Sequence, residues 1–489
     1  MGASAAHYPR PDSVASIPSD IPNLVGGASV PAVSAAWLEK VRPADGSLLC
    51  RVARSDANDV EVAVSAARAA QPEWAERTAV ERGDVLRELA LLLRERREEL
   101  AQVVAEETGK PSELALAETD AAVEMGLFVA GEGRRSYGKT TTASMAHRTV
   151  WTVRQPLGVA ALIMSFNTPL PNVAWKAFPA LFCGNGAVVK PSEHTPVSAW
   201  LFGQLAHEAG VPPGVLNVVQ GLGGEAGAAL VEHPDVDLVS FTGSAATGRW
   251  INETAGRRLA KVCLELGGKN ALVVCDDADL ERAVRWALVS AFSNAGQRCA
   301  SASRIVVFER IYDEFRERFL HGVGELEPDP VISEASLERM QAALDGARRD
   351  GATILAGGAR LDRPGWYLSA TVLEGAAADA EISSTELFGP VTLLYRVRDL
   401  DEAIVLVNSS PYGLTAAVHT ASVHRAMRFA EKIQAGVVVV NGGTHGSEPH
   451  MPFGGVKQSG TGWREAGVET LDVYSDLKVV NVISDPVLA

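Results

Sequence analysis

The sequence predicts an α/β fold with two α/β units in series. From about residue 156 to residue 260, apolar segments of strand length alternate with amphipathic segments of helix length, and short turns containing Gly and Pro join them. This alternation is typical of a parallel sheet with helices on both faces. It resumes after residue 262, so a second α/β unit is expected there. A chain of 489 residues is long enough for two or three units, each with its own core.

The N-terminal region is expected to be an arm followed by helices. Residues 1–24 are rich in Pro, Ser and Ala and lack the apolar segment of a secretory signal, which predicts a flexible arm. Residues 57–132 are expected to be helical. Within them, residues 82–110 carry apolar side chains at helical spacing, with charges on the other face.

The two alternating regions have elements in a regular order. In the first region, strands are expected at 156–166, 186–192, 216–221 and 236–244, and helices at 171–185, 195–210, 223–234 and 245–260. In the second region, helices are expected at 280–291 and 312–326, and strands at 303–310 and, buried, at 436–443. The tail at 471–483 alternates like a strand but lies beyond the second unit. It is expected to need a sheet edge, which a partner subunit could supply.

Composition and charge exclude several classes of protein. The net charge is −15 and no run rich in Lys and Arg occurs, so neither a nucleic acid nor an anionic membrane surface is an expected partner. No apolar run approaches the length of a membrane helix. The five cysteines are odd in number and include no CxxC pair, which argues against a disulfide framework or a zinc site. A reducing compartment, the cytoplasm, is therefore expected.

Cys299 stands out within the stretch "NAGQRCASA", residues 294–302. A thiol reacts as the thiolate, and a neighbouring cation such as Arg298 lowers a thiol pKa if the two side chains face each other. The alternative is a buried structural cysteine.

Glu265 lies at the end of an apolar strand, between two leucines and just before a double glycine. Burial raises the pKa of a carboxyl group, which suits a general base. The alternative is a salt bridge to a core lysine or arginine.

Two glycine-rich turns join strands to helices. The stretch "FTGSAATG" places Gly243 and Ser244 where backbone N–H groups could meet a phosphate at a helix N-terminus. The turn at 221–227 has the same character. Either turn could instead be only a tight connection.

Polar residues also follow two predicted strands. Lys190 and Glu193 stand at the end of one strand, where ligands bind in open α/β sheets, and could hydrogen-bond ribose hydroxyls. Asn167 follows another strand, and its amide could donate to a developing oxyanion. The alternatives are a solvated loop for Lys190 and Glu193 and a simple turn residue for Asn167.

Together these motifs resemble the aldehyde dehydrogenase superfamily. In chain order they read "FN", "KPSE", "FTGS", "LELGGKN", "GQRC", "ELFGP" and "PFGGVKQSG", and the resemblance extends from about residue 41 to residue 480. It implies a Rossmann-like NAD-binding domain at 25–135 and 154–262 and a catalytic domain at 263–470. It also implies a small β oligomerisation element at 136–153 and 471–489, which would form a homodimer or homotetramer.

The resemblance also implies roles for single residues. Cys299 would attack the aldehyde, Asn167 and the Cys299 backbone N–H would hold the oxyanion, and Glu265 would activate water to release the carboxylic acid. The cofactor would be held at the adenosine ribose by Lys190 and Glu193, at the pyrophosphate by Ser244, and at the nicotinamide ribose by Glu386 with Phe388 nearby. Further residues expected at the cofactor are Ser165, Gly223, Gly227, Phe241 and Gly243. No metal is needed for this chemistry.

Several residues refine the expected specificity. The negative charge of Glu193 stands where a 2′-phosphate would lie, which favours NAD over NADP. Glu265 favours hydrolysis over transfer to coenzyme A. Trp175 stands where succinate-semialdehyde oxidisers resemble one another in having an arginine, so a short dicarboxylic semialdehyde would lack that anchor here. The residues expected along the substrate path are Trp175, Arg298, His450 and Phe453, with His445 in the same loop.

Three other functions remain open at this point. A coenzyme-A-acylating semialdehyde dehydrogenase would use the same cysteine, and product analysis would identify it. A cysteine hydrolase would need a histidine partner for the thiol. A non-catalytic protein with the same fold is disfavoured by the presence of Cys299, Glu265 and Asn167. The identity of the aldehyde substrate is left open, and a semialdehyde is one of the candidates.

Overall fold

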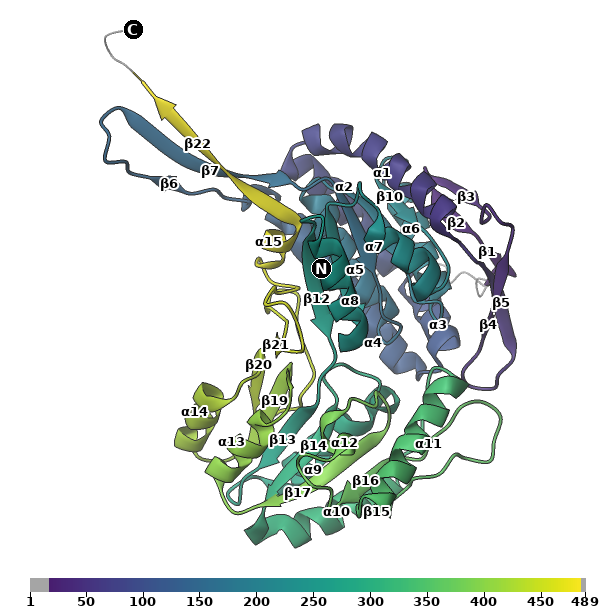
Figure 1. Cartoon of the computed structure of the whole chain (residues 1–489), viewed down its shortest axis with the longest axis vertical. Helices are drawn as coiled ribbons and strands as arrows, with labels where there is room; N and C mark the ends of the chain where they lie inside the picture. The colour runs from purple at the N-terminus through teal and green to yellow at the C-terminus, as the bar shows by residue number, and fades with distance from the viewer. Residues whose placement is uncertain (1–16, 485–489) are drawn as a thin grey trace, which may run out of the picture.

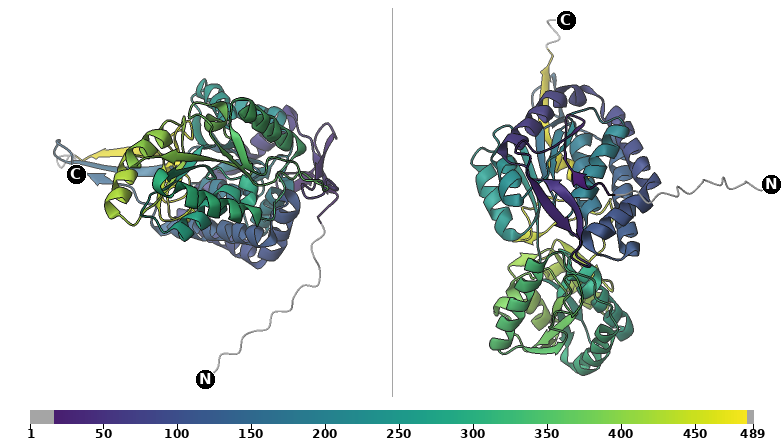
Figure 2. Two further views of the ribbon diagram at one scale, coloured as in Figure 1. Left: turned by 90° about the horizontal axis from the view of Figure 1, so that it is seen from below. Right: turned by 90° about the vertical axis from the view of Figure 1, so that its right-hand side faces the viewer.

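Two seven-stranded sheets organise the chain into two lobes (Figures 1 and 2). The structure is a computed structural model, and it describes residues 17–484. A third, three-stranded sheet projects from the first lobe as an arm (Figure 1). The predicted pair of α/β units is therefore present.

The first sheet has the strand order β12-β11-β8-β9-β10-β2-β3. Its strands are β2 (Asn23–Val25), β3 (Ala28–Val30), β8 (Val159–Ile163), β9 (Gly186–Lys190), β10 (Leu216–Val218), β11 (Leu238–Gly243) and β12 (Lys261–Leu266). The five strands from β12 to β10 are parallel, as predicted, whereas β2 and β3 add to the β10 edge in antiparallel fashion. The predicted division after residue 262 falls within β12.

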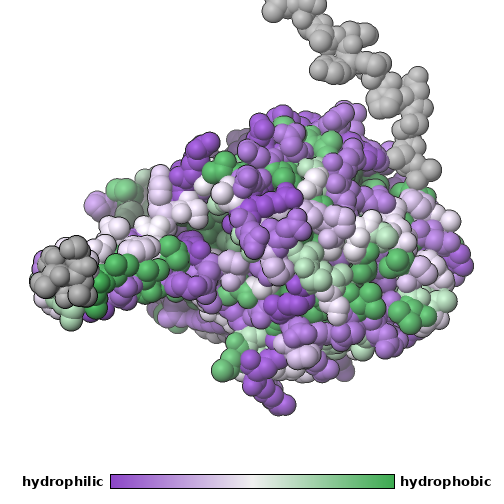
Figure 3. All heavy atoms as spheres, turned by 90° about the horizontal axis from the view of Figure 1, so that it is seen from above, coloured by the Kyte–Doolittle hydropathy of each residue, from purple (hydrophilic) through white to green (hydrophobic). Residues whose placement is uncertain are grey.

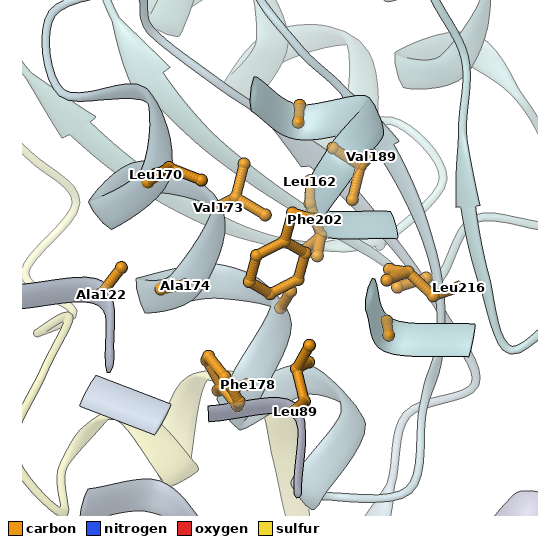
Figure 4. Close-up of a cluster of buried hydrophobic side chains, with 14 of the residues drawn as sticks. Leu89, Ala122, Leu162, Leu170, Val173, Ala174, Phe178, Val189, Phe202 and Leu216 are labelled. Carbon is orange, nitrogen blue, oxygen red and sulfur yellow. The ribbon is translucent and has the colours of Figure 1, made fainter. Parts of the chain in front are cut away.

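Helices cover both faces of this sheet. They are α1 (Ala57–Glu76), α2 (Ala79–Glu95), α3 (Arg97–Thr108), α4 (Ser112–Ala130), α5 (Pro169–Phe182), α6 (Pro196–Glu208), α7 (Ala228–Glu232) and α8 (Ala245–Gly256). In the core on one face, the rings of Phe178 in α5 and Phe202 in α6 meet edge to face at 5.7 Å, near Leu162 and Val189 of the sheet (Figure 4). Because the central strands are buried on both faces, they consist of continuous apolar runs.

The N-terminal prediction was partly wrong. Residues 20–24 form β1 (Asp20–Ile21) and the start of β2, and Ile21 is fully buried. The β1 strand joins β4 (Trp37–Val41) and β5 (Leu48–Ala53) in a small sheet. These pairings are long-range, so the Pro- and Ser-rich composition did not reveal them. Residues 1–16 of the predicted arm lie outside the described residues.

The second sheet has the order β15-β16-β17-β14-β13-β19-β20, parallel except for β15. Its strands are β13 (Asn270–Val274), β14 (Ala302–Phe308), β15 (Thr353–Ala356), β16 (Thr371–Glu374), β17 (Val391–Val397), β19 (Thr415–His419) and β20 (Val437–Val440). The larger helices around it are α9 (Leu280–Phe292), α10 (Tyr312–Gly324), α11 (Glu334–Arg349), α13 (Leu400–Asn408) and α14 (Val423–Lys432). The strand β20 was expected to be buried, but it lies at the sheet edge and is partly exposed.

Short elements complete the two lobes. They are η1 (Gly131–Arg134), η2 (Gly223–Gly227), η3 (Ser293–Gly296), η4 (Glu309–Ile311), α12 (Glu381–Ser384), β18 (Tyr412–Gly413), β21 (Val456–Lys457) and α15 (Thr470–Tyr474). After β21 the chain returns to the first lobe, where α15 packs against α5. The first lobe thus contains residues from both ends of the described chain.

The projecting arm contains β6 (Thr140–Thr141), β7 (Arg148–Pro156) and β22 (Ser475–Ile483). The strand β22 pairs with β7 over its whole length in antiparallel register, from Ser475 opposite Pro156 to Ile483 opposite Arg148. The tail strand is therefore not an orphan, because its partner comes from the same chain, more than 300 residues earlier. Hydrophobic side chains gather along the arm (Figure 3). No helix within residues 17–484 is long and apolar enough to cross a membrane.

Candidate active site

A cleft of about 770 Å³ lies between the two lobes, at the carboxyl ends of the first sheet's strands. Ile163, Lys190, Gly243 and Leu266 are each the last residue of a strand, and all four line the cleft. Open α/β sheets bind ligands at this edge. The second lobe contributes Cys299 to the opposite wall.

A sharp turn presents Cys299 to the cleft. Asn294 and Ala295 in η3 have φ values of 56° and 51°, so the chain leaves α9 through a left-handed turn before reaching the cysteine. The Asn270 side chain donates a hydrogen bond to the carbonyl oxygen of Cys299 at 2.7 Å, which fixes the backbone there. Cys299 is partly exposed, whereas the other four cysteines are buried. Its thiol is therefore the accessible one.

The surroundings of the Cys299 thiol favour its protonated form. Burial raises the pKa of Cys299 to about 12, the carboxyl groups of Glu386 and Glu265 add to the increase, and Arg298 opposes it. The expected lowering by Arg298 is therefore present but is outweighed by burial and the two acids. The bare thiol stays protonated at neutral pH.

Glu265 is a buried carboxyl group without a partner. It lies on β12 opposite Thr242, and neither of its oxygens accepts a hydrogen bond from any described residue. Burial raises its pKa well above 4.5, nearby Glu465 adds to the increase, and Lys176 opposes it. The salt bridge that was the alternative does not form within residues 17–484. Such a group can take up a proton from a reactant in the cleft.

Beside Glu265 lies a buried ion pair between Lys176 of α5 and Glu465. The Lys176 ammonium also donates to the hydroxyl of Ser240 in β11 at 3.0 Å. Glu465 is therefore paired, whereas the neighbouring Glu265 has no partner among the described residues.

The loop after β8 holds Asn167 with its amide in the cleft. Its side-chain oxygen accepts a hydrogen bond from Asn172 at 3.3 Å, while its side-chain nitrogen donates to no described residue. Its backbone carbonyl accepts from Lys110 at 2.7 Å and from Asn294 at 3.3 Å. The loop is thus fixed from two sides, and Asn294 belongs to the turn that presents Cys299.

The residues predicted for the adenosine side gather at one end of the cleft. Lys190 and Glu193 form an ion pair at 3.5 Å. Burial alone would raise the pKa of Glu193, but Lys190 and other neighbours together lower it. The Glu193 carboxylate therefore carries a negative charge at neutral pH. Ser244 is the N-cap of α8 and accepts a hydrogen bond from Thr247 N at 3.3 Å. The α8 N-terminus therefore faces the cleft with its unpaired N–H groups, which favour an anion.

Glu386 lies between the two ends of the cleft. Its carboxylate accepts a hydrogen bond from the backbone of Gly268 at 3.0 Å, and a Cβ at Gly267 would overlap it. The lack of a side chain at Gly267 therefore leaves room for the Glu386 carboxylate to approach closely. Burial raises the pKa of Glu386 to about 7. Phe388 is close by in a left-handed conformation.

On the far side of Cys299, the cleft is lined by aromatic and small side chains. The rings of Trp175 and Phe453 meet edge to face at 5.8 Å. Arg298 and His445 also line this part, and burial lowers the pKa of His445 to about 4, with Arg298 adding to the effect. This part of the cleft therefore combines two aromatic rings with the Arg298 guanidinium and the His445 ring.

Two predicted site residues lie outside the cleft. His450 is exposed and lies 3.7 Å from the exposed carboxylate of Glu448, because the loop turns outward after Ser447. Gly227 is buried in η2 and lies against the Lys190 side chain. The other predicted residues that line the cleft are Ser165, Gly223, Phe241 and Gly243.

Sequence reasoning missed four charged residues at this site: Lys110, Glu118, Lys176 and Glu465. Each is buried, and each has its partner within the set. Lys176 interrupts an otherwise apolar segment, which was the available signal for a buried, paired charge, whereas Lys110 lies among polar residues and gave no such signal. Within residues 17–484, no group of three or more His, Cys, Asp or Glu side chains could hold a metal ion.

Comparison with known proteins identifies the family. The model of the aldehyde dehydrogenase family matches residues 30–480, so the chain belongs to this family. It is 37% identical to a mitochondrial aldehyde dehydrogenase of Leishmania tarentolae over 473 residues, or 94% of each chain.

Solved structures agree with this assignment. The chain is similar to betaine aldehyde dehydrogenase from Staphylococcus aureus in complex with NAD+, with a TM-score of 0.93, 34% identity and 95% of each chain covered. It is also similar to an aldehyde dehydrogenase from Burkholderia cenocepacia, with a TM-score of 0.92 and 36% identity, over 95% of this chain and 97% of that one. The predicted resemblance and the predicted fold class are thereby confirmed.

Proposed function

We propose that this protein oxidises an aldehyde to the carboxylic acid with NAD as hydride acceptor. The observation that carries the proposal is that Cys299, Asn167 and Glu265 line one cleft, with the Glu265 carboxyl group lacking any partner among the described residues. Membership of the aldehyde dehydrogenase family and the NAD+ complex of the Staphylococcus aureus relative support it.

The proposed reaction starts with a covalent bond between Cys299 and the substrate. The Cys299 thiol loses its proton to solvent as the sulfur bonds to the aldehyde carbon and the C=O π bond opens, and the resulting oxyanion accepts hydrogen bonds from the Asn167 amide and the Cys299 backbone N–H. The C–H bond then breaks, and its hydrogen leaves with both electrons, which oxidises the carbon to a thioester. NAD supplies the acceptor for this hydride when it is bound.

Release of the product requires water and a base. Glu265 takes a proton from a water molecule, whose oxygen attacks the thioester carbon. The C–S bond breaks, the carboxylic acid leaves, and the Cys299 sulfur recovers a proton. This base favours hydrolysis over transfer to coenzyme A, which remains the second possibility. A cysteine hydrolase is disfavoured, because Cys299 forms no hydrogen bond with a histidine in the described part of the chain.

The residues of the cleft fit a dinucleotide. The N-terminus of α8 at Ser244 suits the pyrophosphate, and the pair of Lys190 and Glu193 suits the adenosine ribose. Glu386 suits the second ribose. The negative charge of Glu193 favours NAD over NADP, because a 2′-phosphate there would meet like charge.

Assembly and location complete the proposal. We propose that the arm of β6, β7 and β22 joins subunits into a homodimer or homotetramer, since Leu477, Val479 and Ile483 on it are more than half exposed. The five cysteines are all free, which suits a reducing compartment such as the cytoplasm.

NADH absorbance with a panel of aldehydes tests this function. Wild-type protein should form NADH with at least one aldehyde, and the Cys299→Ala variant should lose at least about 1,000-fold in kcat/KM, as expected for the loss of a nucleophile. Free acid should appear without coenzyme A. Equal turnover by Cys299→Ala would overturn the proposal, and an absolute need for coenzyme A would favour the acylating alternative.

A further inference from the structure

Two acids on the substrate side of the cleft are paired with lysines, the pKa of a third, Glu265, is raised well above 4.5 by burial, and one cation there is unpaired among the described residues. Glu118 lines the cleft and pairs with Lys110 at 2.7 Å, while Glu465 pairs with Lys176. Arg298 lines the same region and forms no ion pair or side-chain hydrogen bond with any residue between 17 and 484. Arg298 is therefore the cation on this side of the cleft that pairs with no described carboxylate.

The Arg298 guanidinium is also partly removed from water. Its Nε atom is buried without a hydrogen-bond partner. A buried donor without a partner is costly, and an anionic oxygen group satisfies a guanidinium best because the two can form paired hydrogen bonds. The unpartnered nitrogen therefore points to a ligand that the protein itself does not supply.

The position of Arg298 is fixed by its neighbours along the chain. The side-chain oxygen of Gln297 accepts a hydrogen bond from Ile332 N at 2.8 Å, and its nitrogen donates to Pro330 O at 3.3 Å. On the other side, Asn270 holds the Cys299 carbonyl. The backbone at Arg298 is therefore held rigidly next to the reactive sulfur of Cys299. A substrate that contacts both side chains would need a defined distance between the two groups that they bind.

Neither His445 nor Lys110, which lie near Arg298, supplies a negative charge that would neutralise its guanidinium. His445, whose Nδ1 is also buried without a partner, is neutral at pH 7 because burial and Arg298 lower its pKa to about 4. Lys110 is committed to Glu118 and to the Asn167 carbonyl. Trp175 and Phe453 supply apolar rings to the wall of the cleft.

We infer that the aldehyde oxidised at Cys299 carries an anionic oxygen group at its other end, a carboxylate or a phosphate, which Arg298 binds. His445, whose Nδ1 has no partner among the described residues, lines the same cleft, and the rings of Trp175 and Phe453 suit a short hydrocarbon spacer between the two ends. This inference rests on the proposed function, since it assigns the substrate class of the same cleft.

Matched pairs of aldehydes test the inference. We would compare kcat/KM for ω-oxo acids of three to six carbons with that for unbranched alkanals of equal length, and glyceraldehyde 3-phosphate with glyceraldehyde. The anionic member of at least one pair should be preferred about tenfold or more, as expected for a charge-assisted hydrogen bond. The pair that shows the preference identifies the group as a carboxylate or a phosphate. Equal values in every pair would overturn the inference.

Variants then assign the preference to Arg298. Arg298→Gln should reduce the ratio of anionic to neutral kcat/KM at least tenfold, whereas Arg298→Lys should keep part of it. Arg339, which also lines the cleft and donates to the Leu387 carbonyl on the cofactor side, provides the control. Arg339→Gln should leave the ratio as it is. An unchanged ratio in Arg298→Gln, or an equal loss in Arg339→Gln, would contradict the assignment.

A binding measurement separates this inference from the proposed function. Calorimetric titration of the Cys299→Ala variant with dicarboxylates of four to six carbons and with glycerol 3-phosphate needs no turnover. One of these ligands should bind, and adding Arg298→Gln should weaken its binding at least tenfold. If no aldehyde yields NADH but this anion binds, only the proposed function fails. If aldehydes are oxidised but none of these anions binds, only the inference fails.

Discussion

The Nζ atom of Lys110 lies 2.7 Å from the backbone carbonyl oxygen of Asn167 and donates a hydrogen bond to it. The same ammonium is bound by both carboxylate oxygens of Glu118, each at 2.7 Å. Lys110 follows helix α3 and Glu118 lies in α4, so two helices remote from the thiol hold the loop that carries the proposed oxyanion donor. Lys110 is a positioning residue in this arrangement.

Lys110→Met should lower kcat/KM about 10- to 100-fold, because a small displacement of the Asn167 amide weakens its hydrogen bond to the oxyanion. It should also lower the melting temperature, because Glu118 loses its cation. In Lys110→Met/Glu118→Gln the melting temperature should recover while kcat/KM stays low. Steady-state kinetics and calorimetry measure the two effects.

A matched control exists for this lysine. Lys457 also donates to a backbone carbonyl, that of Asn408 at 2.7 Å, but lies outside the cleft. Lys457→Met should therefore keep the wild-type kcat/KM. Full activity in the Lys110→Met/Glu118→Gln double variant would show that Lys110 has only a structural role.

The pKa of about 12 predicts how Cys299 reacts in the protein without cofactor. The rate of alkylation by iodoacetamide should rise about tenfold per pH unit from pH 6 to pH 9, since the thiolate fraction rises by that factor below the pKa. Peptide mass spectrometry measures the rate at Cys299, with the four buried cysteines as internal references. A plateau near pH 7 would mean that Arg298 outweighs burial and the two acids.

Glu193 should set the choice between dinucleotides. Glu193→Ser removes the charge and frees Lys190 to meet a 2′-phosphate, so the ratio of kcat/KM for NAD to that for NADP should fall about tenfold or more. Glu225 lies in the neighbouring turn but is paired with Arg54, and Glu225→Gln should leave the ratio as in the wild type. The assignment fails if the ratio in Glu193→Ser equals that of the control.

Exposed side chains on β22 should govern assembly. Leu477 and Val479 are two residues apart on one strand and therefore share a face. Replacing both with Lys should dissociate the oligomer, as measured by sedimentation velocity. Val405 is similarly exposed on α13, and Val405→Lys should leave the assembly intact. If the wild type, the Leu477/Val479 double variant and Val405→Lys all sediment identically, the arm does not form the subunit interface.

Local signals in the sequence predicted much of this structure. The central parallel strands and their helices follow from hydrophobic periodicity, and Glu265 could be recognised because a carboxylate between leucines at a strand end is unusual. The features that the sequence did not predict depend on contacts between distant segments. The pairing of β22 with β7 and the partnership of Lys176 with Glu465 join residues about 300 positions apart. Periodicity carries no information about which segments meet.

His450 and His445 show the same limit within one loop. Both histidines were equally plausible lining residues, yet the chain turns between them, so that His445 lines the cleft and His450 points to solvent. The direction of a glycine-rich loop is set by what it packs against, here the second lobe, and not by its own composition.

The central claim is that substrate carbon becomes covalently bound to Cys299 and is released by Glu265. The most direct test mixes the Glu265→Gln variant with NAD+ and an accepted aldehyde, follows NADH in a stopped-flow instrument, and determines the mass of the quenched protein. The expected result is a burst of about one NADH per active subunit, little further turnover, and an acyl group on the peptide that contains Cys299. NADH formation at the wild-type steady rate, or a burst that leaves Cys299 unmodified, would contradict it.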